Sequence, residues 1–183
     1  MPPHRPSIRP AERADLAALT DIYNHYVETS HATFDITPFS VDQRAEWFSH
    51  YATHGPYRLL VAEDQGAVVG YASSSPFRPK PAYQTSVETS VYLHPDAAGR
   101  GLGRAVYREL LAILDREHEH VHRAYAGVAL PNAASVALHL RCGFTPLGIY
   151  HEVGFKFGRY IDVAWFERNV AQATDDEPHE KKV

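Results

Sequence analysis

The sequence has few of the features that mark secreted, membrane or nucleic-acid-binding proteins. It contains one cysteine, which excludes an internal disulfide, and 18 Lys and Arg against 22 Asp and Glu, a formal net charge of -4. No run approaches the ~20 apolar residues that cross a bilayer, and the first residues lack the apolar core of a signal peptide. Without a basic field there is little to attract nucleic acid. We therefore expect a cytoplasmic protein that binds neither nucleic acid nor a membrane.

The chain nevertheless carries enough apolar residues for a core, since 44% of its 183 residues are hydrophobic. Helical spacing marks four segments, 16–27, 41–51, 103–117 and 133–142. Strand patterns mark seven, 7–9, 57–62, 67–72, 86–93, 125–130, 147–156 and 160–167. This order predicts an α/β fold with a mixed central sheet of about seven strands and helices on both faces. We assign residues 1–170 to a single domain and expect the charged tail, 171–183, to be disordered.

Residues 86–104 are the most informative stretch. Apolar and polar residues alternate over 86–93, as in a strand with one apolar face, and Pro95 ends it because proline has no N–H to donate. Three glycines follow at alternate positions over 99–103, just before a helical pattern. Backbone N–H groups at such a helix start point into one space and bind phosphate. A tight turn without a ligand is the alternative interpretation.

Two familiar nucleotide-binding motifs fit this loop poorly. The dinucleotide fingerprint needs G-x-G-x-x-G, whereas the spacing here is G-x-G-x-G. The P-loop needs a lysine followed by Ser or Thr after its last glycine, and this chain has Arg104-Ala105. Both nucleotide interpretations are therefore weakened.

The run Val91-Tyr92-Leu93-His94-Pro95 followed by Gly99-Arg100-Gly101-Leu102-Gly103 resembles the acetyl-CoA loop of the GNAT superfamily of N-acetyltransferases. The order of elements resembles the GNAT order from end to end. The chain departs from the pattern at Ala98, where the superfamily usually has Gln or Arg. The resemblance implies a GNAT-type sheet, acetyl-CoA as co-substrate and no metal. The coenzyme-binding residues it implies are Val91, Tyr92, Leu93, Gly99, Arg100, Gly101, Leu102, Gly103, Arg104, Asn132 and Ser135.

Glu88 is the candidate general base. Glutamate is uncommon in strands, so a carboxylate in this strand, just before the glycine loop, indicates a functional role. Partial burial raises the pKa of a carboxyl group and lets it take a proton from an ammonium substrate, directly or through water. An exposed sheet face is the alternative.

His139 is the second catalytic candidate, and it follows from the resemblance. Asn132 and Ser135 match the GNAT positions that contact the pantetheine arm. Seven residues after that Asn, GNAT enzymes often carry a Tyr that protonates the departing thiolate, and His139 stands there. An imidazole titrates near neutral pH and suits this role. A packed helix histidine remains equally open.

Arg78, Lys80 and Tyr83 lie in a proline-stiffened loop that leads into the Glu88 strand, where two cations would hold an anionic group. Three segments, 22–29, 82–92 and 154–163, resemble the phosphinothricin acetyltransferase branch of the superfamily. This resemblance implies a homodimer that acetylates phosphinothricin, methionine sulfoximine or methionine sulfone, hence herbicide resistance. It implies substrate contacts by Arg78, Lys80, Tyr83, Glu88 and Thr89. Another GNAT activity, on an amine, a peptide N-terminus or a lysine, and a non-catalytic CoA-binding regulatory module remain alternatives.

Two further motifs are given structural interpretations. His118-Glu119-His120-Val121-His122 satisfies the zinc-protease pattern H-E-x-x-H. It straddles the end of a helix, so its imidazoles should diverge, and we expect no metal site there. Cys142 precedes a Gly143-Phe144 helix stop, where a small buried residue packs well, so we expect packing rather than acyl transfer.

Overall fold

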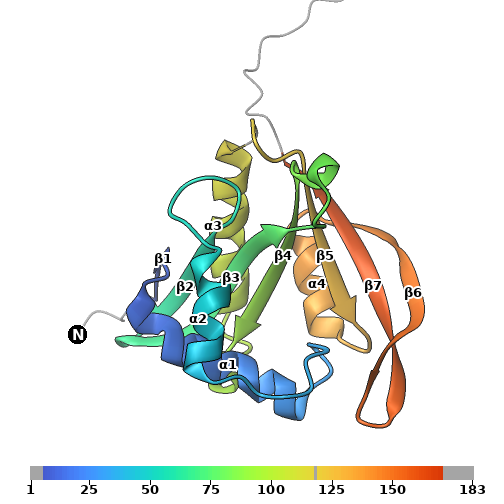
Figure 1. The fold of residues 1–183 in the computed structure, drawn as a ribbon, viewed down its shortest axis with the longest axis horizontal. Coiled ribbons are helices and arrows are strands. Elements are labelled where there is room, and N and C mark those ends of the chain that lie inside the picture. Colours follow the sequence, from blue (N-terminus) through green and yellow to red (C-terminus); the bar gives the residue numbers. More distant parts are fainter. Residues whose placement is uncertain (1–5, 118, 171–183) are drawn as a thin grey trace, which may run out of the picture.

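The computed structural model describes residues 6–117 and 119–170, and seven strands within them form one sheet in the order β1-β2-β3-β4-β5-β7-β6 (Figure 1). The strands are β1 (Ser7–Pro10), β2 (Leu59–Asp64), β3 (Ala67–Pro76), β4 (Ser86–Leu93), β5 (Arg123–Ala129), β6 (Thr145–Lys156) and β7 (Arg159–Asn169). The helices are α1 (Leu16–Thr29), α2 (Val41–Ser49), α3 (Leu102–Arg116) and α4 (Ala133–Arg141), and short 3₁₀ helices cover Arg13–Asp15, Pro81–Tyr83 and Pro95–Ala97. The predicted mixed α/β sheet is confirmed. The predicted tail, 171–183, lies outside the described residues.

Helices cover both faces of this sheet (Figure 1). On one face, Val106, Leu110 and Leu114 of α3 are fully buried in a core to which α4 also contributes. On the other face, Leu19 and Ile22 of α1 form a second core with strands β2 and β3. The apolar spacing predicted for these helices therefore marks the sides that pack on the sheet. Over the described residues, no helix combines the length and the apolar character that crossing a membrane requires.

Strands β4 and β5 form the parallel pair of the sheet, and their pairing is short. The register joins Ser86–Glu88 to Arg123–Tyr125 and goes no further. Beyond Glu88, β4 continues to Leu93, and beyond Tyr125, β5 continues to Ala129. The two strands therefore separate immediately after Glu88. The glycine loop follows the end of β4, which is still paired with β3 on its other side.

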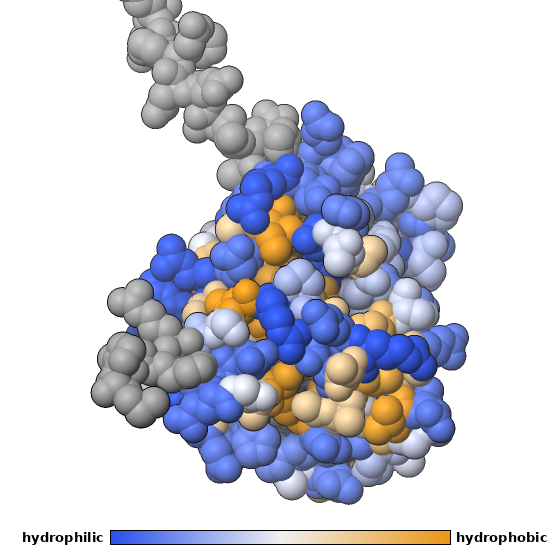
Figure 2. Space-filling view, turned by 90° about the vertical axis from the view of Figure 1, so that its left-hand side faces the viewer, coloured by the Kyte–Doolittle hydropathy of each residue, from blue (hydrophilic) through white to orange (hydrophobic). Residues whose placement is uncertain are grey.

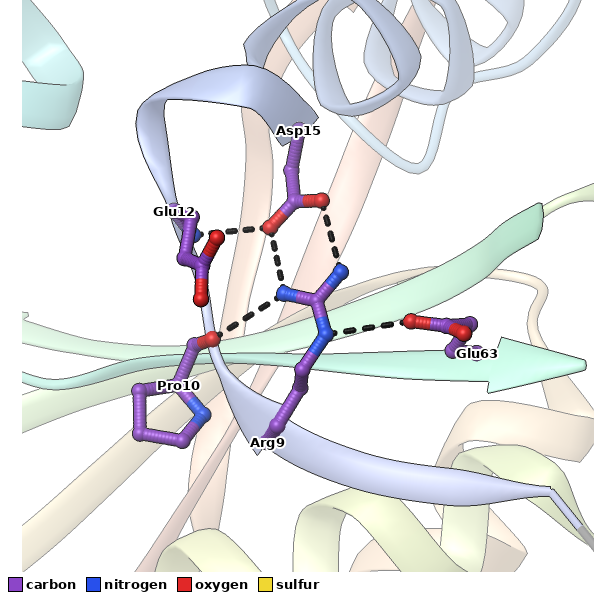
Figure 3. Close-up of polar contacts among 5 residues, drawn as sticks. All are labelled: Arg9, Pro10, Glu12, Asp15 and Glu63. Carbon is purple, nitrogen blue, oxygen red and sulfur yellow. Dashed lines mark hydrogen bonds and ion pairs between the residues drawn. The ribbon is translucent and has the colours of Figure 1, made fainter. Parts of the chain in front are cut away.

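An ion-pair cluster fixes the outer edge of the sheet (Figure 3). The Arg9 guanidinium donates to both carboxylate oxygens of Asp15, at 2.7 and 2.9 Å, and to Glu63 at 3.0 Å. Asp15 also accepts the backbone N–H of Glu12 at 2.7 Å. The cluster ties β1 to β2 and to the start of α1, and the Arg9 hydrogen bonds hold the pKa of Asp15 below its ordinary value.

A local sequence signal places the start of α2. Ser40 and Gln43 form a capping box at this start, because Ser40 Oγ accepts the Gln43 N–H at 3.2 Å and Gln43 Oε1 accepts the Ser40 N–H at 2.8 Å. Strand β6 is less regular than predicted. Its pairing with β7 shifts between Tyr150 and Gly154, and Glu152 has a φ of 54°. Such a bulge bends the strand.

Candidate active site

The gap between β4 and β5 is a cavity of about 560 Å³. The far ends of the two strands form its sides, and the glycine loop and the start of α4 close its ends. Val91, Tyr92 and Leu93 of β4, which the family resemblance implies as coenzyme contacts, all line it. It is a cleft made by strands that stop pairing, with a helix N-terminus at its edge.

The glycine loop leaves this edge open to a ligand. Gly99 and Gly101 have φ angles of 75° and 80°, which side-chain-bearing residues adopt only with strain, and nothing lies within 4 Å of where a Cβ would stand on either. Helix α3 makes its first internal bond from Ala105 N–H to Gly101, at 3.1 Å, so the N–H groups just before Ala105 have no partner within the helix. An open cradle of N–H groups at a helix N-terminus fits a diphosphate.

The two arginines of the loop take different positions. Arg104 lines the cavity, whereas the Arg100 side chain pairs with Asp64 of β2 and lies outside the cavity lining. Arg100 can therefore offer its backbone alone to a ligand in the cleft. Leu102 is buried in the core, and its side chain is likewise turned away.

Helix α4 begins at the opposite end of the cleft. Asn132 Oδ1 accepts the Ser135 N–H at 3.0 Å, so Asn132 caps the start of α4. Both residues line the cavity. Their side chains add polar groups at the end of the cleft that lies away from the glycine loop.

A second cavity, of about 640 Å³, opens on the α1 face of the sheet. It shares five lining residues with the first, Ala32, Ser90, Tyr92, Gly127 and Ala129. The two cavities are therefore continuous across β4 and β5. The sequence analysis missed most of the second cavity, whose apolar wall consists of Phe34, Tyr150, Val153, Phe155, Val163 and Trp165.

Glu88 and Arg78 lie together in this second cavity, as predicted. The Arg78 guanidinium is 3.8 Å from a Glu88 carboxylate oxygen, and the Glu88 side chain is 33% exposed. Burial raises the pKa of Glu88, while the charge of Arg78 opposes that rise. Arg78 also stacks on Phe77, at 4.2 Å from its ring centroid. The site thus combines a carboxylate of raised basicity with a cation held on an aromatic ring.

The other predicted substrate contacts lie elsewhere. Lys80 and Tyr83 are exposed and line neither cavity, and the Tyr83 ring packs edge-on against Phe77. Thr89 is buried on the α3 face, opposite Glu88, because successive strand residues point to opposite faces. Its hydroxyl donates to the Tyr125 carbonyl at 3.1 Å and lies 2.8 Å from the Tyr107 hydroxyl.

His139 lines the first cavity but is only 3% exposed. Its Nδ1 donates to the Ser135 carbonyl at 2.8 Å, and its Nε2 has no hydrogen-bond partner. The ring packs against Tyr107, Phe144 and Phe166. Burial lowers the pKa of His139, so the neutral ring is favoured at pH 7.

The sequence analysis also missed a tyrosine from the first helix. Tyr26 donates its hydroxyl to the Leu93 carbonyl at 2.8 Å and lines the first cavity. Its ring lies 5.4 Å from that of Tyr92. It thus ties α1 to the end of β4 beside the glycine loop. Its helical spacing indicated only core packing.

The two motifs given structural interpretations are the histidine-rich run 118–122 and Cys142. The part of the chain that the structure describes holds no group of three or more metal-ligating side chains, and His118 lies outside it. Cys142 is buried among apolar neighbours, as expected, and burial raises the pKa of its thiol. A raised pKa disfavours the thiolate that acyl transfer would need.

Comparison with known proteins agrees with this geometry. A family model described as an acetyltransferase (GNAT) domain matches residues 8–165. A phosphinothricin N-acetyltransferase of Streptomyces coelicolor is 53% identical over 163 residues, 88% of this chain and 94% of the relative. An L-methionine sulfoximine/L-methionine sulfone acetyltransferase of Salmonella typhimurium is 39% identical over 161 residues, 88% and 92% of the two chains.

A solved structure extends the likeness to a bound coenzyme. The crystal structure of a GNAT superfamily phosphinothricin acetyltransferase from Sinorhizobium meliloti in complex with acetyl-CoA has a TM-score of 0.84 and 37% identity, and the match covers 96% of this chain and 94% of that one. Fold and sequence agree over nearly the whole chain. This chain therefore belongs to the GNAT acetyltransferase family and is an N-acetyltransferase.

Proposed function

We propose that this enzyme acetylates the α-amine of a small amino acid analogue, such as phosphinothricin, methionine sulfoximine or methionine sulfone, with acetyl-CoA as donor. The observation that carries the proposal is the Glu88–Arg78 pair, 3.8 Å apart, in a cavity continuous with the cleft. A base and a cation side by side suit a molecule that carries both an amine and an anionic group. The relatives from Streptomyces and Salmonella, which are named for acetylation of these compounds, support these substrates.

The first cavity would hold the coenzyme. The backbone N–H groups of residues 99–104 would hold its pyrophosphate, and Asn132 and Ser135 its pantetheine arm. Bound there, acetyl-CoA supplies an acetyl group activated as a thioester. The small residues shared by the two cavities, Gly127 and Ala129 among them, leave room for the acetyl group beside the amine.

The remaining chemistry belongs to the chain's own residues. Glu88 removes a proton from the ammonium group, and a backbone N–H near Val91 or Tyr92 polarises the acetyl carbonyl. His139 or a neighbouring hydroxyl, such as that of Ser90, returns a proton to the sulfur. For His139 this requires the doubly protonated ring, because Nδ1 already donates to Ser135.

The loop that carries Arg78 gives the substrate two further contacts in this proposal. Lys80 and Tyr83 stand on the same loop, outside the cavity lining, and would contact the outer end of the anionic group. The Thr89 hydroxyl is bonded on the opposite face of the sheet, to Tyr107 and the Tyr125 carbonyl. Thr89 would therefore affect the substrate indirectly, by fixing the strand that carries Glu88. An enzyme of this activity in the cytoplasm would confer resistance to phosphinothricin as a herbicide.

The far edge of the sheet suits a second copy of the chain. Strand β6, the turn after it and the start of β7 expose a row of apolar side chains: Leu147, Ile149, Tyr150, Val153, Phe155, Phe157 and Tyr160. The side seen in Figure 2 is different, mostly hydrophilic with separate apolar patches. An exposed apolar strand at the edge of a sheet is typical of a surface that another protein chain buries. The enzyme would therefore be a homodimer through β6, and Val153→Lys should shift it toward monomer in analytical ultracentrifugation.

The test is free-thiol release from acetyl-CoA by the purified enzyme. It is offered phosphinothricin, methionine sulfoximine, methionine sulfone, and a panel of ordinary amino acids, polyamines and peptides. Saturable release with one of the first three supports the proposal. Thiol release with another amine only would refute the substrate class. No thiol release with any amine, while the coenzyme still binds, would favour a CoA-binding regulatory module.

A further inference from the structure

Three backbone carbonyls at the end of α1 converge on one buried ammonium group. Lys156, the last residue of β6, donates from Nζ to Ser30 at 2.8 Å, to Thr33 at 2.9 Å and to Tyr26 at 3.3 Å. Its side chain is only 4% exposed. Burying an ammonium group is costly unless its donors are satisfied, and here carbonyl groups do so at the negative end of a helix. The free-energy cost of burying the Lys156 ammonium group indicates that the position of the backbone after α1 is important.

The segment that Lys156 holds forms one wall of the second cavity. Residues 30–36 follow α1 without regular structure. Ala32 lines both cavities, and Phe34 lines the second. Irregular backbone positions its side chains only if something else fixes it. Lys156 supplies two of the hydrogen bonds that do so, to Ser30 and Thr33, from more than 120 residues away in the chain, and its third goes to Tyr26 in the last turns of α1.

A second contact joins the same two segments. The Phe34 ring lies directly over Gly154, so a Cβ on residue 154 would stand 2.0 Å from its Cε1 atom. No real Cβ contact is this short, and the ring would have to move. Gly154 and Lys156 are two residues apart on β6 and therefore fall on the same side of the strand. Gly154 leaves space for the Phe34 ring, and Lys156 hydrogen-bonds the backbone on either side of Ala32.

We propose that Lys156 and Gly154 are positioning residues that set the shape of the amine-substrate pocket by holding residues 30–36 against β6. The inference rests on the proposed function, in which the second cavity takes the amine substrate. It explains a part of the 154–163 segment that the catalytic chemistry leaves unused. Neither residue lines the coenzyme cleft. Phe34, which Gly154 contacts, lines the second cavity alone, whereas Ala32 lines both, so the two positioning residues act mainly on the amine.

The first test replaces Lys156 by methionine, which keeps the length of the side chain and removes its three donors. We expect KM for the amine to rise by about tenfold or more, while kcat and KM for acetyl-CoA change by less than about threefold. The matched control is Arg116→Met, which removes a cation that is 67% exposed at the end of α3. It should leave all three constants unchanged. Equal changes for both substrates, or none, would overturn the inference.

A second test uses the contact between Phe34 and Gly154, and it remains valid if Lys156→Met folds poorly. Gly154→Ala should raise KM for the amine, because the added Cβ displaces Phe34. In the Phe34→Ala background the same substitution should cost nothing further, since no ring remains to be displaced. An equal cost in both backgrounds would show that Gly154 acts by another route.

A third measurement needs no substrate, so it separates this inference from the proposed function. Amide hydrogen exchange of residues 30–36 should be faster in Lys156→Met than in the native enzyme or in Arg116→Met, with coenzyme absent. Unchanged exchange overturns the inference whichever amine the enzyme accepts. Silence in the thiol-release assay overturns the proposed function alone.

Discussion

The Nδ1 atom of His139 lies 2.8 Å from the carbonyl oxygen of Ser135, one helical turn earlier, so Nε2 of the neutral ring carries no proton. Burial lowers the pKa of this ring below its ordinary value of 6.5. The unfolded chain therefore binds a proton below about pH 6.5 that the folded protein resists, and stability should fall as pH drops through that value.

Urea unfolding at a series of pH values measures this dependence. His139→Phe keeps a ring of similar size and cannot titrate, so its free energy of unfolding should vary less with pH over the same range. His54→Gln, which replaces an exposed histidine, is the control and should follow the native profile. A native-like slope in His139→Phe would mean that the ring titrates normally in the folded protein.

Glu88→Gln should lower kcat by roughly a hundredfold or more while acetyl-CoA binding stays nearly intact, because glutamine keeps the shape and cannot take a proton. The base must be ionised to act, and burial raises its pKa. The native rate should thus increase with pH through this raised pKa, and that limb should be absent from the variant. Steady-state rates over a pH series, with a coenzyme-binding titration, check both points. Equal losses of turnover and coenzyme binding would contradict the assignment.

Arg78→Met should raise KM for the amine substrate by about tenfold or more, because one charge-assisted contact to the anionic group is lost. Removing the guanidinium also removes the charge that lowers the pKa of Glu88. The acid limb of kcat/KM should therefore move to higher pH. Arg116→Met, far along α3, serves as the control. A raised KM without movement of the limb would place Arg78 farther from Glu88 in the working enzyme.

Gly101→Ala tests the cradle with a control of the same geometry. Gly101 and Gly66 both have φ of 80° and open space at the Cβ position, but only Gly101 lines the cleft. Alanine at either position should cost about 1–2 kcal/mol of stability. Only Gly101→Ala should raise KM for acetyl-CoA as well. Similar kinetics in the two variants would remove the loop from coenzyme binding.

Signals that are local in the chain predicted well. The glycine loop, Glu88 and Asn132 each stand out from residues within a few positions, and the structure places the loop and Asn132 at the cleft and Glu88 in the second cavity beside it. The apolar wall could not be predicted, because it depends on pairing across the fold. Trp165 reaches the cavity through its register with Gly127, and Phe34 through its contact with β6.

Thr89 illustrates a different difficulty. Strand alternation already separates it from Glu88, and the alternating pattern was visible in the sequence. Resemblance to a family marks a stretch of chain as functional without saying which face each residue takes. The structure resolves this through the hydroxyl contacts of Thr89 with Tyr107 and Tyr125.

The short pairing of β4 with β5 has a thermodynamic consequence. Strands β1 to β4 and strands β5 to β7 meet along this one seam, which three register pairs close. A ligand that touches both sides of the open part couples the two halves and binds the folded state alone. At a concentration one hundred times its Kd, such a ligand adds about 2.7 kcal/mol to stability. Coenzyme supply would then govern how long each enzyme molecule survives as well as how fast it works.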